Sequence, residues 1–197
     1  MNYIKIAGCC VFTMMFAAPL YGQNLNLHTG VLSAIYTDEQ WPGKNPRHQG
    51  YHFGFDVVID DGNYFLMPGI YFLKTSLFPV DLDLKKPYFE FTDIKSIKLP
   101  FQIGSYVYNN RFTDLKLHGG IAVNYLLGID ENPQLLVEDF NEIHTGLLAG
   151  VSFRLLFMTA RFSYEYGLSR IYRKKAPSGI EDKSMSNVLS FMLGLHF

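Results

Sequence analysis

Charged residues at alternate positions of one segment are the clearest candidates for chemistry in this chain. Arg161 and Glu165 are four residues apart in the segment 158–170, and Arg154 lies in the segment before it. Positions of equal parity in a β-strand point to the same side. Charges that face a protein interior must be paired. We therefore expect a structural plug of paired charges, and a path for protons or ions is the alternative.

Polar residues on the same side of the segment 115–128 extend this set. The predicted polar network of the lumen contains Arg154, Arg161, Glu165, His118 and Asn124. The six histidines are scattered and form no zinc-type spacing, so we expect no metal and no other cofactor.

Serine chemistry on lipids is the enzymatic alternative. Ser33, His28 and Asp38 lie on or near the first predicted strand, and Ser105 lies on the fourth. A Ser, a His and an acid near a strand end could serve a lipid-modifying enzyme. No motif selects these residues, so we expect that the protein is not an enzyme.

Two predicted loops carry charge. The acidic residues of the longest loop could bind calcium, although a solvated loop is the favoured interpretation; they are Asp81, Asp83, Glu90 and Asp93. The basic residues of the last loop could meet anionic lipid headgroups; they are Arg173, Lys174, Lys175 and Lys183.

The elements that position these residues are predicted to be strands. Apolar residues recur at every second position, most clearly over 51–59, 115–128 and 189–197. The same rule gives eight strands, at 25–36, 51–59, 64–74, 94–108, 115–128, 142–154, 158–170 and 186–197. Long and short connections alternate between them, as in the transmembrane barrels of outer membranes. The fold expected is an all-β, eight-stranded, antiparallel up-and-down transmembrane barrel.

Composition excludes several other classes. The 197 residues have a net charge of −1, so the chain has no excess of positive charge that would attract nucleic acid. Hydrophobic residues make up 48% and aromatic residues 16%, too many for a disordered chain. The two cysteines, Cys9 and Cys10, leave no disulfide framework for the rest of the chain.

The first 22 residues resemble a secretory signal peptide, with Lys5 before an apolar stretch and Gly22 at the expected cleavage point. The apolar stretch of about 15 residues is shorter than the roughly 20 that a membrane-spanning helix needs. We expect residues 1–22 to be removed and residues 23–197 to form the barrel.

The two faces of the strands decide between a membrane barrel and a soluble, lipocalin-like one. The non-apolar face holds many glycines together with the polar network, which suits the crowded interior of a narrow barrel. We expect the apolar face to contact lipid. Aromatic residues near strand ends would form an interfacial girdle; they are Tyr36, Trp41, Tyr51, Tyr64, Tyr106, Tyr108, Tyr125, Tyr166 and Tyr172. Phe197 on the apolar face resembles a C-terminal assembly signal.

The region after residue 22 resembles the PorT-like family of outer-membrane β-barrel domains. The residues that carry the resemblance are Leu99-Pro100-Phe101, Gly119-Gly120, Gly150-Val151, the stretch 160–168 with its Arg-x-x-x-Glu-x-Gly-Leu pattern, and 188–197. A proline in the middle of a strand, here Pro68, is also similar to the family pattern. The resemblance implies an integral protein of the outer membrane of a Gram-negative bacterium, and for some members a link to a secretion and gliding apparatus.

The function expected is a structural or interaction role, with four long surface loops and a lumen filled by side chains. The partners expected are outer-membrane lipids, the barrel assembly machinery, and other envelope or secretion proteins, and no nucleic acid. A lipid-modifying outer-membrane enzyme and a soluble periplasmic ligand-binding barrel are the alternatives.

Overall fold

A computed structural model describes residues 23–37, 47–77, 92–129, 141–169 and 185–197 of the chain. These residues form eight strands, whose bounds are β1 Gln23–Thr37, β2 Arg47–Asp60, β3 Tyr64–Leu77, β4 Thr92–Asn109, β5 Thr113–Ile129, β6 Ile143–Leu155, β7 Met158–Gly167 and β8 Met185–His196. Each predicted strand is present. The described residues contain no helix that is long and apolar enough to cross a membrane. The predicted signal peptide, 1–22, lies outside the described residues and stays a prediction.

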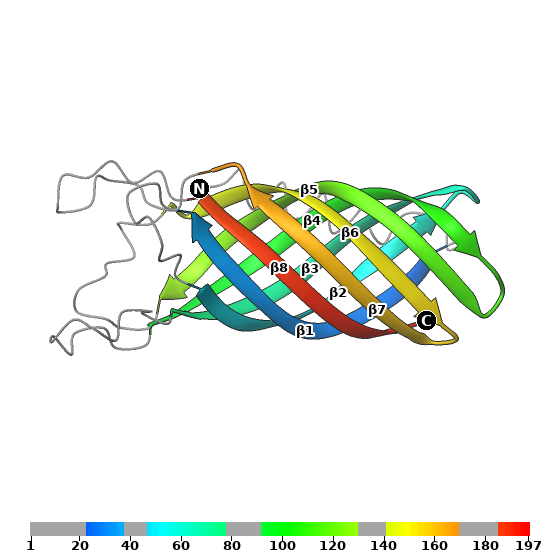
Figure 1. The fold of residues 1–197 in the computed structure, drawn as a ribbon, viewed down its shortest axis with the longest axis horizontal. Coiled ribbons are helices and arrows are strands. Elements are labelled where there is room, and N and C mark those ends of the chain that lie inside the picture. Colours follow the sequence, from blue (N-terminus) through cyan, green and yellow to red (C-terminus); the bar gives the residue numbers. More distant parts are fainter. Residues whose placement is uncertain (1–22, 38–46, 78–91, 130–140, 170–184) are drawn as a thin grey trace, which may run out of the picture.

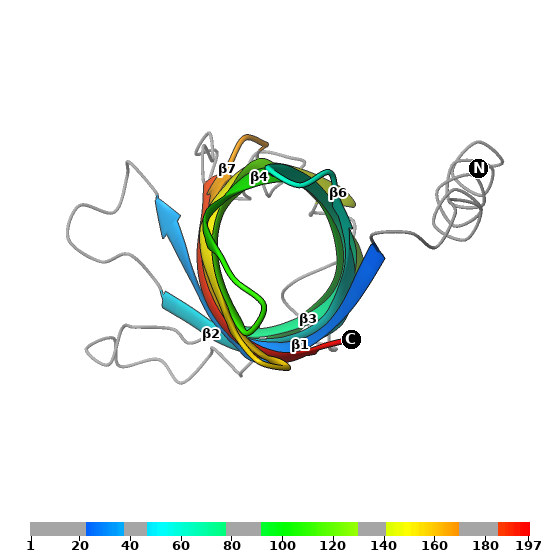
Figure 2. The same ribbon diagram turned by 90° about the vertical axis from the view of Figure 1, so that its right-hand side faces the viewer.

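The strands form one closed barrel in sequence order (Figures 1 and 2). Every strand pairs antiparallel with its neighbour along the chain, and β1 pairs with β8, from Asn26 opposite His196 to Thr37 opposite Met185. Backbone hydrogen bonds between Leu25 and Phe197 continue this seam beyond β8. Closure leaves no exposed sheet edge along the shared length of the strands, as a membrane-spanning sheet requires. The predicted fold class is confirmed.

The connections sort to the two ends of the barrel (Figure 1). The described turns between β2 and β3, β4 and β5, and β6 and β7 lie at one end, together with Gln23 and Phe197. The other four connections leave from the opposite end, here called the loop end. The strand ends are therefore arranged as predicted, with the three short turns at one end of the barrel and the other four connections at the opposite end.

Side chains on the outside of the barrel are apolar, and those on the inside are mostly polar or small. Phe53, Phe101, Ile121 and Phe191 are exposed on the outer surface, whereas the residues next to them in sequence are buried or partly buried inside. On the strands, the described side chains that face outward and carry charge are Lys74, Asp93 and Lys95, and they lie near the loop end. At the opposite end, the exposed charged residues Asp61 and Arg111 lie in the turns. This arrangement is the reverse of a soluble barrel with an apolar interior, so the lipocalin-like alternative was wrong.

Two prolines lie inside strands of the closed sheet. Pro68 faces outward on β3 and Pro100 faces inward on β4. Since proline has no backbone N–H to donate, a ladder is expected to be interrupted there. The pairing of β3 with β4 skips the residues between Pro68↔Phe101 and Tyr71↔Lys98 and then resumes in the same register.

The turn between β6 and β7 is made by Leu156 and Phe157, as the change of parity between the two strands predicted. Leu156 has a φ of 56°, the one positive φ among the described non-glycine residues. A leucine in this region is strained because its Cβ crowds the backbone. Its amide donates to the carbonyl of Phe112, which fixes the turn against the neighbouring one.

Candidate functional site in the barrel lumen

The centre of the lumen is occupied by an ion pair between Arg161 of β7 and Asp56 of β2. Nη1 of Arg161 lies 2.7 Å from Oδ2 of Asp56, and Nη2 lies 3.3 Å from Oδ1. The Tyr71 hydroxyl donates to the same carboxylate and accepts from Nη1 of Arg161 at 2.9 Å. Asp56 is 0% exposed and Arg161 is 3% exposed. A buried pair of this kind is held by its further hydrogen bonds as well as by charge.

Hydrogen bonds extend from this pair to every strand of the barrel. On one side Asn26 donates to Asp56 at 2.8 Å, and His196 Nδ1 lies 2.7 Å from the Asn26 side-chain oxygen. On the other side Arg161 Nε donates to Ser152 Oγ at 3.1 Å. His118 then lies 3.0 Å from Ser152 Oγ and 2.7 Å from Gln102 Oε1.

We call this connected set the central layer; its members, one from each strand in order from β1 to β8, are Asn26, Asp56, Tyr71, Gln102, His118, Ser152, Arg161 and His196. It links all eight strands across the interior.

A second group lies on the loop-end side of the central layer. Lys98 of β4 forms an ion pair with Glu165 of β7, and Asn124 of β5 donates to the other oxygen of Glu165 at 2.6 Å. Glu165 is 4% exposed. Gly146 makes room for this carboxylate, since a Cβ there would lie 2.7 Å from Glu165 Oε1.

A third group fills the turn end. Asp114 of β5 pairs with Arg154 and lies 3.5 Å from Lys116 Nζ. The Lys116 ammonium lies over the rings of Phe65 and Tyr106, 5.7 Å and 5.2 Å from their centres, which is cation–π distance. The Tyr106 hydroxyl in turn donates to Asp60 at 2.8 Å.

Inward glycines stand directly opposite the large side chains of the lumen. Gly54 is paired with Tyr71, Gly120 with Gln102, and Gly150 with His118. A Cβ on Gly54 would lie 2.8 Å from Tyr71 Cδ1, and one on Gly120 would lie 2.7 Å from the Gln102 Cα. These glycines provide the space in which the network side chains cross the lumen.

The structure divides the predicted lumen residues among the three groups. Arg161 and His118 belong to the central layer, Glu165 and Asn124 to the loop-end group, and Arg154 to the turn-end group. Arg161 and Glu165 do not pair with each other, as a direct Arg–Glu network would require. Arg161 binds Asp56, and Glu165 binds Lys98.

Sequence reasoning missed the partners Asp56, Tyr71, Lys98, Asp114 and Lys116. Strand parity contained the signal for them, because Lys98 shares the parity of Gln102 and Gly104, and Asp56 that of Gly54. Tyr106 was assigned to the outer girdle, which was wrong: it lies inside, packed edge-on against Phe65 with ring centres 5.3 Å apart.

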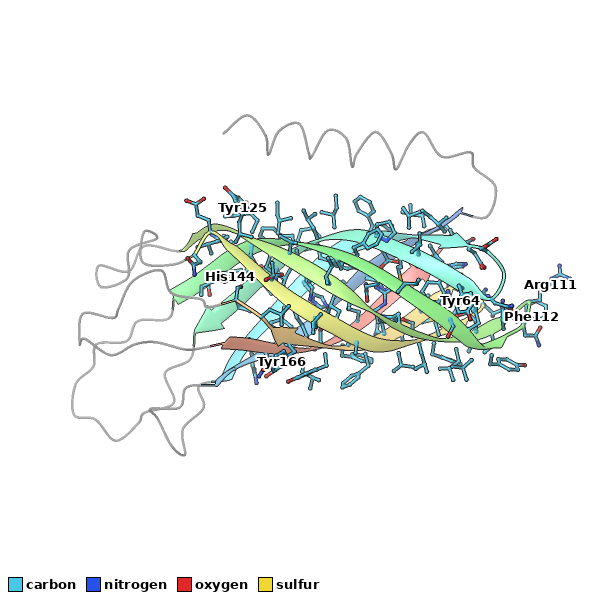
Figure 3. The ribbon with its side chains drawn as sticks, turned by 90° about the horizontal axis from the view of Figure 1, so that it is seen from above. Tyr64, Arg111, Phe112, Tyr125, His144 and Tyr166 are labelled. Carbon is cyan, nitrogen blue, oxygen red and sulfur yellow. The ribbon has the colours of Figure 1, made fainter. Side chains whose placement is uncertain are left out.

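Other girdle residues lie on the outside. Tyr64 is at the turn end, and Tyr125 and Tyr166 are near the loop end (Figure 3). Tyr51 and Tyr108 are also exposed. The remaining girdle candidates, Tyr36, Trp41 and Tyr172, have side chains outside the described part. Phe197 is 66% exposed, and its backbone pairs with Leu25.

The candidate catalytic residues are not brought together. His28 is buried in the lumen, whereas Ser33 and Ser105 have the parity of the outer face. Asp93, which was predicted to lie in the acidic loop, lies in β4 and pairs with Lys74. Asp81, Asp83 and Glu90, like Asp38 and the basic loop residues, lie outside the described residues. Within the described ranges no three metal-ligating side chains gather into a cluster.

The charged side chains of the lumen are balanced in number. Arg161, Lys98, Arg154 and Lys116 are matched in number by four acids, Asp56, Glu165, Asp114 and Asp60. An eight-stranded barrel has an interior that side chains just fill. An open aqueous channel would require these pairs to separate.

The closed barrel, its apolar exterior and its paired polar interior together define a transmembrane β-barrel. Barrels of this type lie in outer membranes, so the chain is an outer-membrane β-barrel protein.

The solved structures that are similar to this chain include the following two. Neisserial surface protein A (NspA) is 12% identical, with a TM-score of 0.50 over 88% of this chain and 97% of that chain. The attachment invasion locus protein Ail of Yersinia pestis is 15% identical, with a TM-score of 0.48 over 88% and 98%. No protein-family model matches the chain, and no curated protein matches its sequence.

Proposed function

We propose that the protein is a non-conducting outer-membrane barrel with a structural or interaction role, which presents four long connections on the cell surface. The single observation that carries the proposal is the central layer, in which one side chain from each strand joins a hydrogen-bonded set across the lumen. A barrel closed in this way offers its rim and its loops, rather than a pore, for function.

The connections that leave the loop end support the interaction role. The strands there are separated by 9, 14, 13 and 17 residues, most of which lie outside the described part, whereas the described turns at the opposite end have 3, 3 and 2 residues. In outer-membrane barrels the long connections face outward and the short ones face the periplasm. The partners proposed are outer-membrane lipids around the barrel, the assembly machinery that inserts it, and other envelope proteins at the loops.

Conductance in a planar bilayer tests the closed lumen. The purified native chain should give no steady unitary conductance. The variant Arg161→Ala combined with Lys98→Ala removes one cation from each of two successive groups, and it should admit measurable ion current. The matched variant Arg111→Ala alters an exposed turn outside the lumen and should remain silent. A steady native conductance would contradict the proposal.

The specialised form of this role is a PorT-like component of a secretion or gliding apparatus. The Arg161-x-x-x-Glu165-x-Gly167-Leu168 pattern supports it, because this stretch is the most specific part of the resemblance to that family. Deletion of the gene should then reduce the secreted protein fraction, and the native gene should restore it. If neither secretion nor gliding changes, the protein is not a component of such an apparatus, and the general interaction role still stands.

A further inference from the structure

The three turns at the turn end of the barrel differ in polarity. The turn between β2 and β3 has the sequence Asp61-Gly62-Asn63, and the turn between β4 and β5 has the sequence Asn110-Arg111-Phe112. The turn between β6 and β7 consists of Leu156 and Phe157 alone. The first two turns carry polar side chains suited to water, and the third carries none.

Four consecutive apolar side chains are exposed at the turn between β6 and β7. Leu155 is 51% exposed, Leu156 52%, Phe157 59% and Met158 56%. Leu155 and Met158 form the last pair of the ladder between the two strands. We call residues 155–158 the apolar turn. Large apolar side chains that are exposed together mark a surface of contact with another apolar body.

The backbone of the apolar turn is held in place on both sides. The Leu156 amide donates to the Phe112 carbonyl at 2.6 Å, and the Phe157 carbonyl accepts from the His196 amide at 2.8 Å. Arg154 Nη1 donates to the Leu156 carbonyl at 3.4 Å. Backbone polar groups need such partners wherever water is absent. These three groups are therefore compatible with an environment of hydrocarbon.

The apolar exterior of the neighbouring strands runs into the apolar turn without a break. Phe153 of β6 and Phe162 of β7 are exposed on this face, and so is Leu195 of β8, which is paired with Met158. No described outward side chain of β6 or β7 carries a charge. The turn thus continues the surface that faces lipid, which indicates the chemistry of its partner.

The length of β7 points to the same partner. A strand that spans a bilayer needs about 9–11 residues, and β7 has 10. Tyr166 lies near the loop end (Figure 3), and about 9–11 residues counted back from it end at positions 156–158. On β3 a span of this length, 64–74, runs from an outward tyrosine to an outward lysine and leaves the polar turn 61–63 outside it.

The hairpin of β4 and β5 reaches further along the barrel axis than the apolar turn does (Figure 1). Arg111 and Phe112 lie at its far end (Figure 3). The Arg111 guanidinium is 5.6 Å from the centre of the Phe112 ring, and the Phe112 carbonyl is bonded to Leu156. Charge therefore begins directly beyond the residue that contacts the apolar turn.

We propose that the apolar turn is inserted among the acyl chains of the leaflet at the turn end, close to their headgroups. The partner of Phe157 and Met158 is phospholipid, and the border of the membrane passes beyond them while it leaves Asp61 and Arg111 in water. The proposal rests on the contact between the apolar exterior and lipid, and it removes one of the three short turns from the aqueous compartment.

Tryptophan fluorescence of the full chain in phosphatidylcholine vesicles tests this insertion. The single tryptophan, Trp41, is replaced by phenylalanine, and Phe157→Trp introduces the reporter. Lipid brominated near the headgroup end of its chains should quench the emission, and iodide on both sides of the membrane should not. Met158→Trp reports on the same turn if Phe157→Trp does not fold, as judged by the migration of the unboiled protein on a detergent gel.

Two further reporters supply the controls. Arg111→Trp, in the neighbouring turn, should be quenched by iodide and have its emission at longer wavelength than Phe157→Trp. Phe191→Trp, outward on β8, should be quenched by lipid brominated near the chain ends.

Iodide quenching of Phe157→Trp as strong as that of Arg111→Trp would overturn the proposal. Quenching by neither agent would also overturn it, because a second copy of the chain would then cover the turn. If brominated lipid fails to quench Phe191→Trp as well, the lipid contact of the whole outer face is refuted rather than the insertion of this turn alone.

Discussion

Arg161 and Asp56 are 105 positions apart in the chain, yet their side chains meet inside the barrel with Nη1 2.7 Å from Oδ2. The pair joins β7 to β2, which are not neighbours in the sheet. It therefore connects strands that no backbone ladder connects. Tyr71 and Asn26 hold the carboxylate, and Ser152 and Met67 hold the guanidinium.

Arg161→Met should destabilise the barrel strongly. It leaves the Asp56 carboxylate buried without its cation, and losing one member of a buried pair costs about 3–5 kcal/mol. Urea unfolding in lipid vesicles measures the free energy of unfolding. Arg111→Met, in an exposed turn, is the control and should change nothing measurable.

The double variant Asp56→Asn with Arg161→Met separates the charge from the packing. The free energy of unfolding should fall by less than the sum of the decreases in the two single variants, because no unpaired charge is left buried. Strictly additive losses would mean that the two side chains act independently, against the geometry observed.

Gly120→Ala and Gly119→Ala are adjacent changes with opposite expected outcomes. A Cβ on Gly120 would enter the lumen 2.7 Å from the Gln102 Cα, whereas one on Gly119 would meet the Leu148 carbonyl at 3.3 Å. Overpacking of this kind costs about 1–3 kcal/mol. The folded fraction on an unboiled detergent gel should fall for Gly120→Ala and stay close to native for Gly119→Ala. Equal behaviour would show that position 120 does not face a filled interior.

Phe191→Arg tests the depth of the apolar band. Phe191 lies outward near the middle of β8, opposite Val31 of β1 and Phe162 of β7. Arginine at the bilayer midplane costs about 2–4 kcal/mol and much less near the interface. Tyr64→Arg, at the turn end, is the matched variant and should refold with nearly native stability (Figure 3). A similar loss of stability in both variants would argue against a bilayer whose midplane lies near the middle of β8.

Leu156→Gly should stabilise the turn between β6 and β7. A left-handed backbone conformation costs a leucine residue about 1–2 kcal/mol, and glycine adopts it without this energy cost. The unfolding rate in vesicles should fall. Phe157→Gly is the comparison, since Phe157 has no positive φ and gains nothing from glycine. A faster-unfolding Leu156→Gly variant would mean that the side chain contributes more than the strain costs.

The strands and their faces could be predicted because both follow from local rules. Period-two alternation requires no knowledge of the partner strand, and it located β2, β5 and β8 to within a few residues. The change of parity between Val151 and Phe162 located the turn at Leu156, although that turn has none of the usual turn residues.

The pairing inside the lumen could not be predicted in the same way. Which side chains meet across a barrel depends on shear and tilt, and these properties of the closed sheet leave no mark in a single strand. Arg161 and Glu165 share a face, but their spacing along β7 carries them to different heights, where Asp56 and Lys98 respectively lie within reach. Tyr106 shows a simpler error, since its parity with Gly104 already indicated the interior.

A single-cysteine scan along β8 tests most directly whether lipid surrounds the apolar face. Cys9 and Cys10 are replaced by serine, and a nitroxide label is placed in turn at residues 189–195 in vesicles. Labels at Leu189, Phe191, Leu193 and Leu195 should collide with oxygen dissolved in the bilayer, while those at Ser190 and Met192 should be shielded. Shielded odd positions, or accessibility without a period of two, would contradict the account.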